Sequence, residues 1–68
     1  MKIYYDAKFD LLYLRLSPEK QNITNINVMD DIVFDIGEGD KIIGIEIMDA
    51  SKHVNLESLM PVEYPRAG

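Results

Sequence analysis

Hydrophobic and polar residues alternate along several short stretches of the chain, and the clearest of these runs from Ile32 to Ile47. A period of two is typical of a β-strand with one face turned to the core. The stretch is interrupted at Gly39-Asp40, which favours a two-residue type II′ turn. Counting outward from that turn predicts a β-hairpin with three apolar cross-strand pairs: Ile36 with Ile43, Phe34 with Ile45 and Ile32 with Ile47.

Residues 2–6, 11–16 and 23–28 are each predicted to form a further strand. The first two are joined by residues 7–10, a connection short enough for a tight hairpin. In the second, Leu12, Leu14 and Leu16 share one face, and we expect that face to point to the core. The third has asparagine at positions 22, 25 and 27, which predicts a place at the edge of the sheet.

The pattern changes after the last of these strands. Asp49 is the expected N-cap of a helical segment that reaches Met60 and is ended by Pro61. Apolar residues are irregularly spaced here, so we expect one broken helix or two short turns. The predicted fold is α+β: a small antiparallel sheet of about five strands in hairpins with a short C-terminal helical segment, in a single domain over residues 1–60 followed by a tail at 61–68.

Size and charge narrow the classes of function. The chain has 68 residues, and a domain of this size buries only about 60% of the surface of its unfolded chain. It has no cysteine, so no disulfide compensates for that small core. The net charge of −5 and the scattered basic residues argue against nucleic acid as a partner. The chain shows neither a signal peptide core nor an apolar run long enough for a membrane span, so we expect a soluble, cytoplasmic protein, and we assign it no cofactor.

Two carboxylates are the most suggestive pair for chemistry. The predicted register places Asp35 and Glu46 as diagonal neighbours on the second face of the hairpin. Such a pair could bind a divalent cation or act as acid and base, but a metal needs more ligands and catalysis needs a pocket. The alternative is a structural ion pair with Arg15, so we define a candidate polar cluster of Arg15, Asp35 and Glu46. His53 is interpreted as a partly exposed helical side chain rather than a general base.

The second face of the predicted sheet also carries apolar side chains. Four of them form our candidate interface: Leu11, Tyr13, Val33 and Ile42. One short helix covers one face of a small sheet, and monomers rarely leave several hundred Å² of apolar surface open. Covering about 400 Å² at about 25 cal/mol per Å² is worth about 10 kcal/mol gross. We therefore expect a homodimer or a complex with another protein.

Three separated motifs occur in an order and spacing that resemble a known prokaryotic family. They are the run from Tyr5-Asp6 to Asp10-Leu11-Leu12-Tyr13-Leu14-Arg15-Leu16, the run Asp30-Asp31-Ile32-Val33-Phe34-Asp35, and the run Gly44-Ile45-Glu46-Ile47-Met48-Asp49-Ala50-Ser51-Lys52. The chain resembles the family catalogued as domain of unknown function 2283 over residues 2–53. The resemblance brings no established activity, and it makes an antitoxin role conceivable because such short acidic proteins are sometimes encoded beside small toxin-like proteins.

Three hypotheses about function follow. The first is a non-enzymatic protein-interaction or self-associating module. The second, which rests on the resemblance, is an acidic antitoxin that occupies a small basic toxin, with Asp35 and Glu46 supplying charge complementarity. The third is a metal-dependent hydrolase that uses the same two carboxylates.

Overall fold

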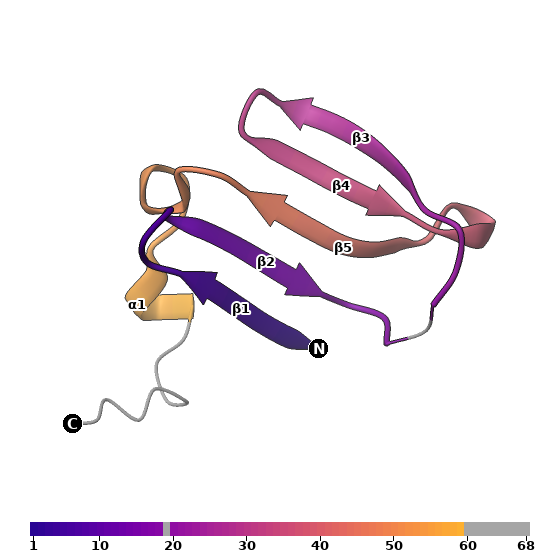
Figure 1. The fold of residues 1–68 in the computed structure, drawn as a ribbon, viewed down its shortest axis with the longest axis horizontal. Helices are drawn as coiled ribbons and strands as arrows, with labels where there is room; N and C mark the ends of the chain where they lie inside the picture. The colour runs from indigo at the N-terminus through magenta and orange to yellow at the C-terminus, as the bar shows by residue number, and fades with distance from the viewer. Residues whose placement is uncertain (19, 60–68) are drawn as a thin grey trace.

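The computed structural model describes residues 1–18 and 20–59 and consists mainly of one antiparallel sheet (Figure 1). Its five strands lie in the order β1-β2-β5-β4-β3. Their bounds are β1 Lys2–Asp6, β2 Leu11–Arg15, β3 Thr24–Met29, β4 Ile32–Ile36 and β5 Ile42–Ile47. The predicted strands and the edge position of the asparagine-rich strand are confirmed. Because the helical pieces are short, the fold is dominated by the sheet.

The register of the central hairpin agrees with the prediction in two of three pairs. Ile32 lies opposite Ile47 and Phe34 opposite Ile45, but Ile36 pairs with Ile42, because a β-bulge shifts the register near the turn. The predicted Ile36–Ile43 pair is therefore wrong.

The turn of that hairpin also differs from the prediction. The Gly37 amide donates to the Lys41 carbonyl at 2.8 Å, which encloses the 3₁₀ turn Glu38–Asp40 (η1). The backbone angle φ is +73° at Gly39 and +60° at Asp40, whereas a type II′ turn has a positive φ only at its first central residue. The loop is longer and more tightly curled than the two-residue turn that the dipeptide favours.

Two short helical turns follow β5, as the irregular spacing of apolar residues predicts. They are the 3₁₀ turn Ala50–Lys52 (η2) and helix α1, Leu56–Leu59. Asp49 precedes the first turn but makes no side-chain cap, so its predicted capping role is wrong. Asn55 caps the second turn instead, because its Oδ1 accepts the amides of Glu57 at 3.1 Å and Ser58 at 3.2 Å. The tail predicted at 61–68 lies outside the described residues.

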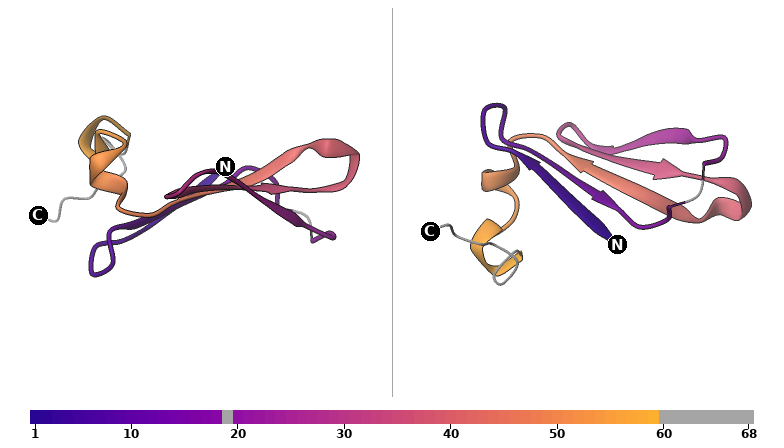
Figure 2. Two further views of the ribbon diagram at one scale, coloured as in Figure 1. Left: turned by 90° about the horizontal axis from the view of Figure 1, so that it is seen from above. Right: turned by 60° about the horizontal axis from the view of Figure 1, so that its bottom comes forward.

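One face of the sheet is apolar across all five strands, and we call it the apolar face. Cross-strand pairing lines up two rows on it, which are Tyr5-Leu12-Ile47-Ile32-Met29 and Ile3-Leu14-Ile45-Phe34-Ile26. Seen edge-on, the helical turns stand at one end of the sheet (Figure 2, left). Val54 and Leu56 pack there against the cluster of Leu12, Ile47 and Ala50.

Burial on the apolar face is uneven. Leu12 is 0% exposed beneath them, whereas Ile26 and Met29 on the edge strand β3 are 48% and 56% exposed. Leu14 and Ile45 belong to the second row and are only partly buried, although they lie on inner strands. In the part of the chain that the structure describes, the helical turns therefore cover only one end of this face, although Ile43 near the start of β5 is also buried, at 1% exposed.

Asp10 fastens the helical turns to the sheet. It ends the β1–β2 turn with a φ of +54°, and its carbonyl accepts the Ala50 amide at 2.9 Å. Its carboxylate accepts the Ser51 hydroxyl at 2.7 Å and the Tyr5 hydroxyl at 2.8 Å. The hydrogen bond from Ser51, followed by that from Tyr5, holds the pKa of Asp10 below its ordinary value. Sequence reasoning missed this clamp, although an aspartate just before a strand is a common turn residue.

Candidate functional site

The opposite face of the sheet collects the polar side chains of the strands, and we call it the polar face. Cross-strand pairing lines up two rows on it, which are Lys2-Arg15-Gly44-Asp35-Asn25 and Tyr4-Tyr13-Glu46-Val33-Asn27. This face is more polar than expected from sequence, because asparagines of β3 and Lys2 of β1 extend the polar rows to both edges. A surface of this kind recognises ligands through specific hydrogen bonds and charges rather than through apolar area.

Asp35 is the centre of a hydrogen-bond network on the polar face. Its side chain is buried, with 5% of its surface exposed. The Tyr13 hydroxyl donates to one carboxylate oxygen at 3.1 Å, and the Asn25 amide donates to the other at 2.6 Å. The network joins β2 to the hairpin of β3 and β4, and it supplies hydrogen bonds to a buried carboxylate that would otherwise be costly.

Gly44 allows the Tyr13 side chain to cross β5 and contact Asp35 on β4. It lies on β5 between the strands that carry Tyr13 and Asp35. A Cβ atom at Gly44 would overlap the Tyr13 hydroxyl and ring, so only glycine lets the ring lie flat across the strand. Burial raises the pKa of the Tyr13 hydroxyl and Asp35 raises it further, while the hydrogen bond with Arg15 opposes both.

The three residues of the candidate polar cluster lie near one another but differ in their partners. The observed register places Asp35 opposite Gly44 and Glu46 opposite Val33, so the two carboxylates are diagonal neighbours as expected. Arg15 lies opposite Gly44 on the other side, and its Nε donates to the Ser17 carbonyl. Asp35 takes its hydrogen bonds from Tyr13 and Asn25. The arrangement allows Asp35 to hold the Tyr13 hydroxyl in place.

The residues of the candidate interface are spread along the polar face. Glu46 lies between Tyr13 and Val33 in the register. The row that holds Asp35 lies between Val33 and Ile42. Leu11 lies opposite Asp6 near the β1–β2 turn. The four apolar side chains are therefore interrupted by polar neighbours, and the continuous apolar surface lies on the other face.

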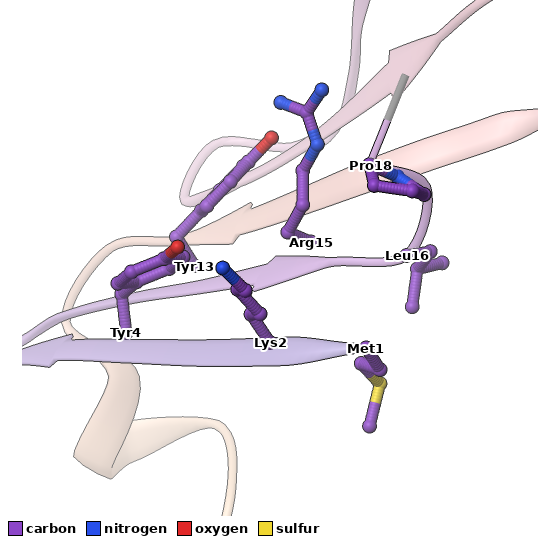
Figure 3. Close-up of a pocket in the computed structure, with 7 residues that line it drawn as sticks. All are labelled: Met1, Lys2, Tyr4, Tyr13, Arg15, Leu16 and Pro18. Atoms are coloured by element: carbon purple, nitrogen blue, oxygen red, sulfur yellow. The ribbon is translucent and has the colours of Figure 1, made fainter.

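A hollow of about 480 Å³ lies beside the Asp35 network, over strands β1 and β2. It is lined by Met1, Lys2, Tyr4, Tyr13, Arg15, Leu16 and Pro18. Lys2, Tyr4, Tyr13 and Arg15 rise from the same side of β1 and β2 (Figure 3). The rings of Tyr4 and Tyr13 are stacked, with centroids 6.3 Å apart and planes 27° apart. The hollow combines two basic side chains with an aromatic wall, a combination that no sequence motif in the chain indicated.

The remaining titratable candidates lie away from this face. His53 Nε2 lies 3.0 Å from an Asp31 carboxylate oxygen, so the histidine links η2 to the start of β4. It is exposed as predicted, but it lies just after η2 and not within a helix, and sequence reasoning missed its acidic partner. Within residues 1–18 and 20–59, no group of three or more His, Cys, Asp or Glu side chains is arranged to hold a metal ion. The same residues contain no helix of the length and hydrophobicity that a membrane crossing requires.

Comparison with known proteins gives one family and one curated relative. Residues 2–51 match the family model described as protein of unknown function DUF2283. A protein of Methanosarcina mazei with the name putative hypoxanthine phosphoribosyltransferase is 40% identical over 65 residues, which are 93% of this chain and 51% of that protein. The chain thus spans about half the length of this relative. No solved structure matches the chain.

Proposed function

This chain belongs to the DUF2283 family of proteins of unknown function, and we propose that it is a self-associating module whose apolar face packs against the same face of a second copy. The observation that carries the proposal is the pair of apolar rows that cross all five strands, of which the helical turns cover only one end. A sheet with one hydrophobic face needs a second layer, and a single short helical segment is too small to supply it.

The composition of the two faces decides which of them meets the second copy. The rows of the apolar face contain no charged side chain, so two acidic chains can meet there without burying an unpaired charge. Contact through the polar face would instead have to bury Lys2, Arg15 and Glu46. We therefore move the proposed interface from Leu11, Tyr13, Val33 and Ile42 to the apolar face.

A second copy suits this face because it presents the same two apolar rows and can supply the missing layer. Two sheets packed face to face lie about 10 Å apart and form a β-sandwich. Under twofold symmetry the open β3–β4 half of each sheet covers the other, while both sets of helical turns stay at the ends. Covering about 400 Å² of apolar surface in this way contributes about 10 kcal/mol gross, which is comparable to the whole stability of a small domain.

The test is the molar mass of the full chain in solution, with two lysine variants of the same strand. Ile26 and Asn27 are both exposed on β3, but their side chains point to opposite faces. We expect sedimentation equilibrium to give a dimer for the wild type and for Asn27→Lys, and a monomer for Ile26→Lys. Both variants add the same charge, so a difference between them reports the face and not the charge.

Two results would overturn this proposal. A monomer at concentrations up to hundreds of micromolar would mean that another protein, or the chain beyond Leu59, covers the face. Dimers that Ile26→Lys leaves intact and Asn27→Lys disrupts would place the contact on the polar face. An antitoxin role and hydrolysis by Asp35 and Glu46 stay open alternatives, and the first predicts a stable complex with a basic protein.

A further inference from the structure

The hollow beside Tyr13 has the size of a small-molecule site. Its volume of about 480 Å³ lies within the range of about 300–1,000 Å³ that is usual for such sites. Four of its lining residues, Lys2, Tyr4, Tyr13 and Arg15, belong to the polar face, whereas the proposed dimer interface lies on the apolar face.

The aromatic wall of the hollow is held in a fixed position. Tyr13 is fastened at its hydroxyl by Asp35 and lies over Gly44. Tyr4 stacks on Tyr13 and is 53% exposed. An exposed tyrosine ring backed by a second, immobile ring is a platform on which a planar ligand can stack with little loss of side-chain entropy.

Positive charge lies beside the aromatic wall in the same hollow. Lys2 lies directly opposite Arg15 in the register, and like charges at opposed positions repel each other. Lys2 has no ion-pair partner among the described residues. An anion between the two strands would be attracted by both side chains, and in a chain with a net charge of −5 such a local excess of positive charge favours an anionic ligand.

The spacing between the basic and the aromatic side chains of the hollow sets the shape of the ligand. Lys2 and Tyr4 are two residues apart on β1, so their side chains stand about 7 Å apart on one face. A phosphate group and a nucleobase joined through one ribose span a similar length. The Arg15 guanidinium, which already bonds the Ser17 carbonyl and the Tyr13 hydroxyl, adds its positive charge beside Lys2.

We propose that the hollow formed by Lys2, Tyr4, Tyr13 and Arg15 binds a small ligand with a phosphate group joined by a short spacer to a planar ring, as in a nucleoside monophosphate. The ring stacks on Tyr4, and the phosphate lies beside Lys2 and Arg15. The Asp35 network contributes indirectly, because it keeps the Tyr13 ring in place.

The test is a titration of the ¹⁵N-labelled full chain with adenosine monophosphate, followed by amide chemical shifts. We expect shifts concentrated on β1 and the end of β2, and a weaker response to adenosine or to inorganic phosphate alone. Lys2→Gln and Tyr4→Ala, both at exposed positions, should each weaken binding about tenfold, equivalent to about 1.4 kcal/mol. Lys8→Gln removes the same charge from the β1–β2 turn, where Lys8 lies over the Phe9 ring, and should leave the affinity unchanged.

Each other outcome contradicts a stated part of this inference. The absence of shifts at millimolar nucleotide would overturn it entirely, as would an affinity that Lys2→Gln and Tyr4→Ala do not alter. Phosphate binding as tightly as the nucleotide would remove the role of Tyr4, and adenosine binding as tightly would remove that of Lys2. Because Lys2, Tyr4, Tyr13 and Arg15 stand on the polar face, failure here leaves the proposed dimer standing, and the reverse also holds.

Discussion

The side chains on the two faces of this sheet are stabilised in different ways. On the polar face, side chains from neighbouring strands complete one another, and Asp35 obtains both of its hydrogen bonds within the sheet. On the apolar face, the side chains need a second layer, which reaches only one end of the sheet. Hydrogen bonds are local and directional and can be completed by a single layer, whereas removal of apolar surface from water requires atoms on both sides. A single sheet can therefore complete the hydrogen bonds of its polar face alone, but it cannot bury its apolar face without a second layer.

The largest loss of stability is expected from a substitution at the covered end of the apolar face. Leu12→Ala removes a fully buried side chain from beneath the helical turns, and we expect it to cost about 2–5 kcal/mol of stability in urea unfolding. Ile26→Ala on the same face removes an exposed side chain. It should cost less, and its cost should grow with protein concentration if a second copy covers β3. Equal costs for the two variants would contradict the difference in burial between the two ends of this face.

The next largest loss of stability is expected at Gly44, where the packing of Tyr13 on the polar face requires a residue without a side chain. Gly44→Ala introduces a methyl group that overlaps the Tyr13 hydroxyl and ring, so we expect a loss of about 1–3 kcal/mol. In a Tyr13→Ala background the same substitution should be close to neutral, because the clashing ring is gone. This double-mutant cycle isolates the contact between the two residues, and additive costs would show that Gly44 is needed for another reason.

Strand positions were predictable because the period-two pattern is local, and two pairs of the central hairpin followed from it. The third pair failed because the bulge beside Ile36 depends on how the loop closes from Gly37 to Lys41, and a dipeptide signal does not contain that geometry. The Asp35 network depends on β2 lying beside β5, a pairing between distant strands. Sequence reasoning selected Asp35 as a polar candidate but could not identify Tyr13 and Asn25 as its donors.

A smaller loss of stability is expected when a single hydroxyl group is removed from the polar face. Tyr13→Phe leaves Asp35 with the Asn25 amide as its remaining donor from this network, and we expect a loss of about 1 kcal/mol in urea unfolding. Tyr4→Phe removes the hydroxyl of the exposed partner ring, for which the structure gives no hydrogen bond, and should be close to neutral. Equal stability losses for the two variants would show that the hydrogen bond from Tyr13 to Asp35 does not contribute to the stability of the fold.

The smallest effect concerns the clamp that holds the second layer on the apolar face, because the Asp10 carboxylate lies at the surface. Its pKa is below the ordinary value of 3.8, with the Ser51 hydrogen bond as the main cause. The folded state therefore binds fewer protons than the unfolded state near that pH. The contribution to stability is present above about pH 4 and is lost as the pH falls through the lowered pKa. Urea unfolding of wild type and Asp10→Asn should accordingly differ at pH 7 and converge towards pH 2, whereas a constant difference would show that the clamp acts without the carboxylate charge.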